Sequence, residues 1–364
     1  MIGTLVAANL KQRPVRTALS ILLIAIPVAL MLTMVGLSRG FVEDSARRAR
    51  GVGADIIVRS PDYVSGSFSL NNMPQKLVDV IRGLPHVRFA TGVAGHQVSG
   101  WIAVSGINVA EFEQMSGKFV FREGHSFEKP DDILLDTYYA RQRQVHAGDT
   151  LRLFNRDWNV AGVVEPGKLS HLFLPLEVVG DFDGTSGKVG AIYIAVDKPD
   201  NVASVMDSVR ALLPRYYVQS MEELISLTSV DNVPFLRPFL NVVVGIAVVI
   251  GAAVSALSMY MAIQQRTREI GILKALGAAK TWLLRVILTE ALFLGMGGSV
   301  LGIGFTFLGR WLLAKLVPAS LPQAIVPEWW PIAGAIAMVA AMLGALYPAM
   351  LAARQDPIEA LAYE

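Results

Sequence analysis

The segment 162–169, GVVEPGKL, comes close to the glycine-rich loop that binds nucleotide phosphates. That loop has the pattern GxxxxGK followed by Ser or Thr, because the hydroxyl group holds the Mg²⁺ ion. Gly162, Gly167 and Lys168 match the pattern, whereas Leu169 stands at the hydroxyl position and cannot bind a metal. We therefore expect a turn that follows a strand, and no nucleotide site in this chain.

The histidines and acidic residues do not have the spacing of a metal or catalytic site. No two histidines are four residues apart, as they are in zinc proteases. The segment Asp181-Phe-Asp183-Gly184 resembles half of a calcium loop but lacks the third oxygen ligand and the distal glutamate. The chain has no cysteine, which excludes disulfides, thiolate–metal sites and cysteine nucleophiles. We expect solvated or structural histidines, no metal and no catalytic residues. The histidines are His86, His96, His125, His146 and His171.

The composition indicates a membrane protein with one soluble-like insert. Apolar residues make up 53% of the 364 residues and charged residues only 17%, against about 25% charged in soluble domains. Residues 39–236 carry 20 Lys/Arg and 24 Asp/Glu, whereas the remainder carries 12 and 6. No basic run is interleaved with aromatic residues, so we expect no binding to nucleic acid.

Four long apolar segments predict transmembrane helices, because a bilayer core requires roughly 20 helical residues. The first could also be a cleavable signal peptide, but its 22 uncharged residues exceed the apolar run of such a peptide, about 7–15 residues. Small residues four apart, Gly298 with Gly302 and Gly251 with Ser255, favour a bundle or a dimer. The four predicted spans are 17–38, 239–263, 286–309 and 330–351.

The basic residues predict the orientation of these spans. The segments 1–16 and 264–285 are rich in Lys and Arg, whereas the loop 310–328 has only two. By the positive-inside rule both termini, including the tail 352–364, and the 264–285 loop are cytoplasmic. Residues 39–236 are then extracytoplasmic, and segment 1–16 is expected to form an interfacial helix.

The sequence of the extracytoplasmic domain predicts a mixed α/β fold. Apolar and β-branched runs predict strands, and Pro199 and Pro214 bracket a helix at 200–212. The segments 39–54 and 220–236 are expected to be stalks between this domain and the spans. The predicted strands are 55–60, 87–95, 101–107, 149–154, 158–164 and 191–196.

The stretch REIGILKALGAAKTW, residues 268–282, interrupts the apolar pattern between the second and third spans. Helical spacing places Ile270, Leu273 and Leu276 on one stripe, with charged residues around it. Gly277 can adopt the left-handed conformation that ends a helix. The pattern predicts a short cytoplasmic helix, and the alternative is a loop whose charges only fix the topology.

Glu290 is the unusual charge, because it lies about two turns into the third span. Ionisable residues within a bilayer are rare and often functional. The pattern leaves two interpretations open. Glu290 either makes a polar contact that locks its helix to a neighbour or transmits a shift, or it is a carboxylate at headgroup level near Arg285.

The residues 267–304, TREIGILKALGAAKTWLLRVILTEALFLGMGGSVLGIG, resemble the permease domain of the FtsX/MacB family of ABC systems. The end of the chain, YPAMLAARQDPIEALAYE (347–364), and its start, ANLKQRPVRTALSILLIAIPVAL (8–30), are similar to the same family. GADIIVRSP (53–61) and ILLDTYYARQRQVHAGDTLRLF (133–154) resemble the family's external core domain.

The resemblance implies a bacterial inner-membrane permease with four transmembrane helices and a large mixed α/β extracytoplasmic domain between helices 1 and 2. It also implies that a separate cytosolic ABC ATPase binds the short helix and carries the ATP and Mg²⁺, so that this chain needs no cofactor. A second copy of the chain or a homologous permease would complete the assembly, and a membrane-fusion adaptor is a further candidate partner. The residues expected to couple to the ATPase are Arg268, Glu269, Ile270, Gly271, Leu273, Lys274 and Gly277.

The family's macrolide exporters carry a fused ATPase ahead of the first span, where this chain has 16 residues. We therefore expect the ATPase on another polypeptide. The implied activity is mechanotransmission, in which ATP hydrolysis moves the external domain, for efflux or extraction of an amphiphile, lipid or lipoprotein. The alternative is a signalling subunit that regulates an external partner without transport.

Overall fold

The computed structural model describes residues 2–61, 71–99, 102–182, 184–227, 236–316 and 323–354. The chain divides into two compact units. The helix unit comprises Met1–Arg39, Pro234–Leu313 and Gln323–Glu364, and the sheet unit comprises Gly40–Val233 and Ala314–Pro322. The predicted fold class is confirmed, since a mixed α/β domain lies between the first and second of four long apolar helices.

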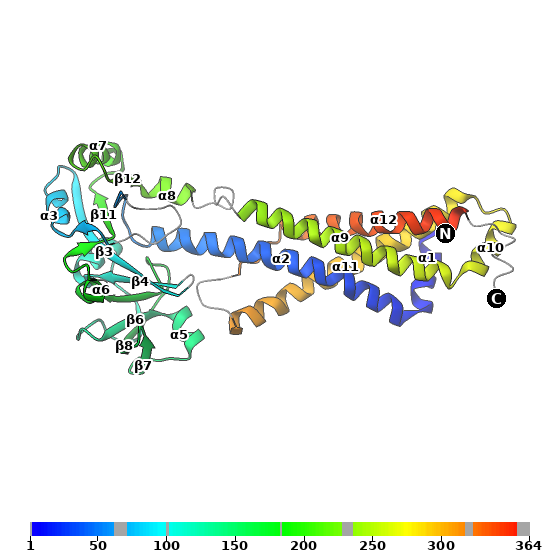
Figure 1. Cartoon of the computed structure of the whole chain (residues 1–364), viewed down its shortest axis with the longest axis horizontal. Coiled ribbons are helices and arrows are strands. Elements are labelled where there is room, and N and C mark those ends of the chain that lie inside the picture. Colours follow the sequence, from blue (N-terminus) through cyan, green and yellow to red (C-terminus); the bar gives the residue numbers. More distant parts are fainter. Residues whose placement is uncertain are drawn as a thin grey trace. The chain divides into compact units, whose positions relative to one another are not determined.

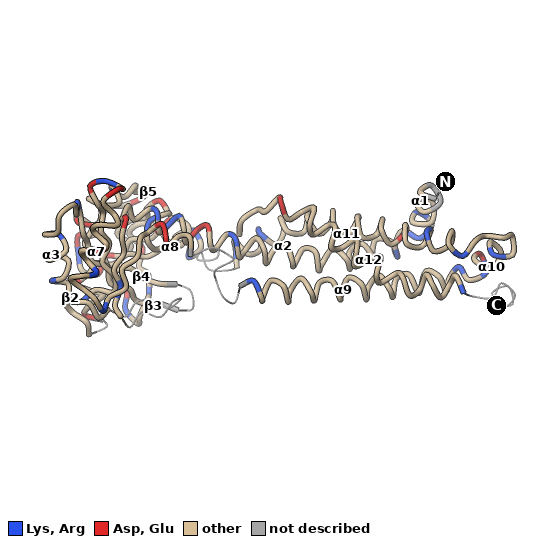
Figure 2. The backbone as a smooth tube through the Cα atoms, turned by 90° about the horizontal axis from the view of Figure 1, so that it is seen from above, with Lys and Arg blue, Asp and Glu red and all other residues tan. Residues whose placement is uncertain are grey.

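The long helices of the helix unit run side by side (Figure 1). Four of them, α2, α9, α11 and α12, are long and apolar enough to cross a membrane. Figure 2 shows that the middle of α9 carries no charged residue. The helices of this unit are α1 (Ile2–Gln12), α2 (Pro14–Arg50), α9 (Leu236–Gln264), α10 (Thr267–Ala275), α11 (Lys280–Leu316) and α12 (Trp329–Arg354).

The start of α2 and the end of α11 extend beyond the predicted transmembrane spans. The helix α2 begins at Pro14, where a proline is favoured because its missing N–H would have no helical partner. The helix α11 continues to Leu316, so the first part of the predicted loop 310–328 is helical. No proline or glycine stands between Arg310 and Leu316, and the next helix breaker is Pro318. Of the predicted tail, residues 355–364 lie outside the described part of the chain.

Small residues allow the helices of the bundle to approach closely. A Cβ atom added to Gly298 would lie 2.5 Å from a methyl carbon of Ile24, and one added to Gly302 would lie 2.7 Å from Val28. The hydroxyl group of Ser255 donates a hydrogen bond of 2.7 Å to a backbone carbonyl of α12. Both small-residue pairs seen in the sequence therefore have contacts inside this bundle.

The sheet unit is built on a ten-stranded sheet. Nine of its strands follow the order β12-β1-β11-β3-β4-β9-β6-β8-β5, and the tenth, β7, pairs with β8. The pairs β4–β9 and β6–β8 are parallel and the other pairs are antiparallel. The strands β2 and β10 form a separate pair. The strands are β1 (Ile56–Arg59), β2 (Met73–Pro74), β3 (Val87–Ser99), β4 (Ile102–Ile107), β5 (Phe121–Gly124), β6 (Asp132–Asp136), β7 (Thr150–Leu153), β8 (Arg156–Val164), β9 (Leu172–Pro175), β10 (Lys188–Val189), β11 (Ala191–Val196) and β12 (Tyr217–Ser220).

The six predicted strands are present as β1, β3, β4, β7, β8 and β11, although residue 101 at the start of the third lies outside the described residues. The predicted helix at 200–212 is present as a short 3-10 turn, η1 (Pro199–Asn201), followed by α7. Of the predicted second stalk, Met221–Leu227 is helical and 228–235 lie outside the description. The helices are α3 (Lys76–Arg82), α4 (Val109–Ser116), α5 (Thr137–Arg143), α6 (Leu176–Phe182), α7 (Val202–Leu212) and α8 (Met221–Leu227).

The segment that resembles a phosphate loop is a turn after β8, as predicted. Gly167 and Leu169 adopt left-handed backbone conformations with φ of 112° and 43°. The ammonium group of Lys168 donates hydrogen bonds to the backbone carbonyls of Gly117 and Lys118. Burial lowers the pKa of Lys168. This lysine therefore ties two loops of the sheet unit together.

Asp183, in the segment that resembles a calcium loop, lies outside the described residues.

Candidate functional site

The helix α10 forms a short elbow between α9 and α11. It ends in a Schellman motif, in which the Ala278 N–H donates to the Leu273 carbonyl and the Gly277 N–H donates to the Lys274 carbonyl, both at 3.0 Å. Gly277 has φ of 91°, a conformation that glycine adopts without strain. The helix therefore ends where the sequence predicted, and α11 begins at Lys280.

The predicted apolar stripe of α10 is divided between two environments. Ile270 is buried with 7% of its surface exposed, whereas Leu273 and Leu276 are 37% and 81% exposed. Ile270 and Leu273 share a face as predicted, because both line one pocket, whereas Leu276 lies beyond the end of the helix at Ala275. An exposed leucine next to the elbow is available to a partner.

The seven predicted coupling residues fall into three groups. Ile270 and Gly271 face the interior of the bundle. The ammonium group of Lys274 donates a hydrogen bond of 3.0 Å to the backbone carbonyl of Ala353, which ties α10 to the end of α12. The remaining four lie on the exposed surface, and they are Arg268, Glu269, Leu273 and Gly277.

A pocket of about 200 Å³ lies beneath α10, between α1, α9 and α11. Its apolar lining includes Ile263, Trp282 and Leu283. Arg266, Glu269 and Glu290 contribute its charged side chains. The side chains beneath α10 therefore leave a pocket with both apolar and charged lining residues.

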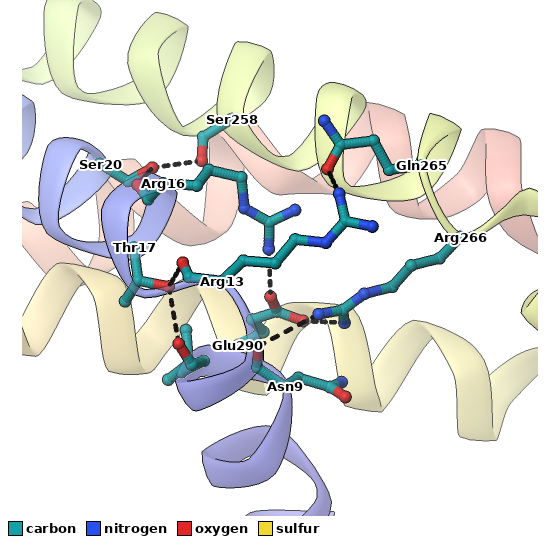
Figure 3. A network of polar contacts seen from close by, with 10 residues as sticks. Asn9, Arg13, Arg16, Thr17, Ser20, Ser258, Gln265, Arg266 and Glu290 are labelled. Carbon is teal, nitrogen blue, oxygen red and sulfur yellow. Dashed lines mark hydrogen bonds and ion pairs between the residues drawn. The ribbon is translucent and has the colours of Figure 1, made fainter.

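Glu290 connects four helical elements through one buried carboxylate (Figure 3). Its side chain is 5% exposed, with one oxygen 3.5 Å from Nη2 of Arg16 and the other 3.7 Å from Nη1 of Arg266. Arg266 also donates a hydrogen bond of 3.2 Å to the backbone carbonyl of Asn9. Glu290 belongs to α11, Arg16 to α2 and Asn9 to α1, and Arg266 stands at the N-terminus of α10. We call Arg16, Arg266 and Glu290 the Glu290 cluster.

Further polar contacts surround the Glu290 cluster. Arg13 contacts the side-chain oxygen of Gln265. The hydroxyl groups of Ser20 and Ser258 are 2.6 Å apart, which links α2 to α9 (Figure 3). The cluster itself holds two guanidinium groups against one carboxylate. The loss of the carboxylate would therefore leave two guanidinium groups, only 17% and 11% exposed, without their anion, which is a costly arrangement.

Sequence reasoning singled out Glu290 but missed its partners. In the sequence, Arg16 and Arg266 belong to the basic segments 1–16 and 264–285, which predict only the orientation of the spans. A signal was nevertheless present, because Arg16 and Arg266 stand beside apolar segments at the same predicted side of the membrane as the start of the third span.

Comparisons with known proteins place these features in a family. The model of the FtsX-like permease C-terminal domain matches residues 241–357, which include α10 and Glu290. The model of the MacB-like periplasmic core domain matches residues 17–212. The chain therefore has the two domains of an ABC transporter permease. It belongs to the FtsX/MacB family.

Two relatives show how much of the chain is shared. An uncharacterized ABC transporter permease of Methanocaldococcus jannaschii is 24% identical over 97% of this chain and 95% of its own length. The pyoverdine export ATP-binding/permease protein PvdT of Pseudomonas savastanoi pv. phaseolicola is 27% identical over 96% of this chain, which spans only 57% of that protein. The crystal structure of the periplasmic region of MacB from Actinobacillus actinomycetemcomitans matches 48% of this chain and 92% of that structure, with 16% identity and a TM-score of 0.38.

Proposed function

We propose that this chain couples ATP hydrolysis by a separate cytosolic ABC ATPase to movement of its sheet unit, for the efflux or extraction of an amphiphile, lipid or lipoprotein. The observation that carries the proposal is the structure of α10. This helix is held in the bundle by Ile270 and presents exposed apolar and charged residues, among them Leu276 and Arg268.

The exposed surface of α10 has the chemistry of a docking site. Leu276 is 81% exposed, and Leu273 and Ile272 are 37% and 45% exposed. Complete burial of one leucine side chain contributes about 1.5–3 kcal/mol. Arg268 and Glu269 flank these residues and could select a partner by charge. An apolar centre with a charged rim is typical of protein interfaces.

The Glu290 cluster supplies a route from α10 to the first long helix. Arg266 stands at the N-terminus of α10, so a shift of that helix displaces its guanidinium group. Glu290 then passes the displacement to Arg16, because buried ion pairs resist separation. Arg16 lies near the start of α2, which is one helix of 37 residues that ends at Arg50 in the sheet unit.

The relatives support the efflux part of the proposal. Relatives with similar coverage are named for pyoverdine export and for macrolide export, and both are described as ATP-binding/permease proteins. The chain spans 57% and 58% of these two relatives. The signalling alternative makes a different prediction. It expects ATPase binding without movement of a labelled lipid or lipoprotein in proteoliposomes, whereas our proposal expects both.

The test is a binding measurement with a matched control. We expect Leu276→Asp to weaken the complex with the partner ABC ATPase by at least about tenfold, because 1.4 kcal/mol changes a dissociation constant by that factor. Leu316→Asp is the control, since Leu316 is 77% exposed at the far end of α11. Equal affinity of the two variants would contradict the proposed role of α10.

A further inference from the structure

The end of α2 carries a second buried charged cluster, which lies within the sheet unit. Asp44 and His171 are 4% and 5% exposed, and Asp136 is 1% exposed. An Nη1 atom of Arg48 is 3.2 Å from a carboxylate oxygen of Asp44 and also contacts Nε2 of His171. The other ring nitrogen of His171, Nδ1, contacts the carboxylate of Asp136. We call these four residues the His171 cluster.

The contacts assign the hydrogen-bonding roles of the two ring nitrogens of His171. A guanidinium group can only donate hydrogen bonds, so the Nε2 atom that faces Arg48 must be the acceptor. The proton of the neutral ring is then on Nδ1, which donates to Asp136. His171 therefore bridges the two partners directionally, accepting from a residue of α2 and donating to a residue at the end of β6.

Asp136 extends this bridge into the sheet unit. Its side chain caps α5 by accepting a hydrogen bond of 2.8 Å from the Tyr139 N–H. Its own N–H donates a hydrogen bond of 2.9 Å to the carbonyl of His171. Any displacement of His171 is therefore transmitted to the end of β6 and to the first turn of α5.

The backbone at the end of α2 is held as tightly as the side chains. The Leu169 N–H donates a hydrogen bond of 3.0 Å to the Arg48 carbonyl. A Cβ atom at Gly51 would lie only 1.8 Å from the carbonyl oxygen of Gly167, so only glycine fits there. The end of α2 consequently has one position against the loop 166–171 and little freedom to slide.

We propose that the His171 cluster is the joint through which α2 moves the sheet unit, with His171 as its positioning residue. This inference rests on the proposed coupling function and identifies the residues through which the movement reaches the sheet unit. The ionic and hydrogen-bonded contacts define the direction and register in which α2 lies against the sheet unit. Apolar packing alone would be less specific. The helix α2 contributes Arg16 to the Glu290 cluster and Arg48 to the His171 cluster, so one helix connects the two joints.

Two substitutions of His171 separate the contact to α2 from the contact within the sheet. In His171→Asn, the amide nitrogen takes the place of Nδ1 and can donate to Asp136, but no atom reaches Arg48. In His171→Gln, the longer side chain places a carbonyl oxygen where Nε2 accepts from Arg48. The link to Asp136 is then the backbone hydrogen bond from the Asp136 N–H to the carbonyl of residue 171, which both substitutions leave in place. His86→Asn is the matched control, because His86 pairs with Asp197 at 3.0 Å on the exposed surface.

The experiment measures hydrogen–deuterium exchange of the full chain, bound to its ABC ATPase in lipid nanodiscs, without nucleotide and with ATP trapped by vanadate. Peptides covering 267–275 report on α10, and peptides covering 137–143 report on α5. In the wild type we expect ATP to change exchange in both. In His171→Asn the α10 response should remain and the α5 response should be lost, whereas His171→Gln and His86→Asn should keep both.

The outcomes distinguish the two proposals. An absent α10 response in the wild type would refute the proposed coupling function. An α5 response that persists in His171→Asn, with α10 responding, would overturn the joint alone. Thermal unfolding of each variant identifies loss of folding. If His171→Asn does not fold, Arg48→Cys/His171→Cys provides a second test in this cysteine-free chain. A short bifunctional thiol reagent should restore the α5 response of that variant, and a folded, cross-linked protein without the response would also contradict the joint.

Discussion

Removal of the Glu290 carboxylate should both destabilise the helix unit and uncouple it from the ATPase. At 3.5 and 3.7 Å, each ion pair with Arg16 and Arg266 contributes about 4–5 kcal/mol of attraction at an effective dielectric constant of about 20. Desolvation of the three groups offsets much of this attraction. Because Glu290→Ala leaves two largely buried guanidinium groups without their anion, with only the Asn9 carbonyl left to Arg266, we expect a net loss of about 3–5 kcal/mol in the free energy of unfolding.

The assay is an SDS titration of the detergent-solubilised protein, followed by circular dichroism. Glu328→Ala is the control, because Glu328 pairs with Arg39 in the same unit but both side chains are well exposed, at 56% and 39%. Such a pair contributes about 0–1 kcal/mol. Equal destabilisation by the two substitutions would refute the argument that burial makes the Glu290 cluster strong.

A triple substitution separates stability from coupling. Arg16→Leu, Arg266→Leu and Glu290→Leu together remove every charge of the cluster, and apolar replacement of buried ion pairs is often neutral or stabilising. We expect this variant to regain stability relative to Glu290→Ala while the permease no longer stimulates its ATPase partner. If stimulation is retained in the triple variant, the cluster is structural and does not transmit movement.

Three further predictions follow from single residues. Gly277→Val should reduce stimulation of the ATPase, because a left-handed backbone costs a side chain about 1–2 kcal/mol, whereas Gly304→Val, at a position with open space and no positive φ, should not. Gly302→Leu should destabilise the bundle by about 1–3 kcal/mol in the SDS titration through overpacking against Val28, and Gly304→Leu should have little effect. Hydrogen bonds from Asn201 and His86 lower the pKa of Asp197 from 3.8 to about 2. The stability that the Asp197 carboxylate contributes is therefore fully present above pH 3.8 and is lost as the pH falls through 2. The melting temperatures of wild type and Asp197→Asn should accordingly converge at low pH.

The long helices were predictable because their sequences contain a single dominant signal, an apolar run of the length of a bilayer. Gly277 was predictable for a similar reason, since a helix that must turn within a few residues requires a left-handed position. The strand β6 was missed because all five of its residues are buried, so the sequence DILLD shows no clean alternation. The short helices α3 to α6 were missed because seven or eight residues are too few for a clear helical period.

The candidate site was only partly predictable, because its contacts join residues far apart in the chain. Glu290 drew attention as a charge in an apolar segment, but the choice of Arg16 and Arg266 as partners depends on how the helices pack. The sequence around His171 shows no spacing that would indicate a site, since its partners come from the end of α2 and the end of β6. Exposure of Leu276 depends on where α10 ends, which periodicity locates only to within a residue or two.

The separation of 274 residues between Arg16 and Glu290 has a consequence for biosynthesis. At about 5–20 residues per second, the ribosome needs on the order of 14–55 s to make that intervening chain. Arg16 must therefore remain beside its span without its carboxylate until the third span has entered the bilayer. The headgroups of the membrane surface can solvate the guanidinium group during that interval. The order of insertion thus gives Arg16 the membrane surface as its first partner, and its pairing with Glu290 forms only when the third span is in place.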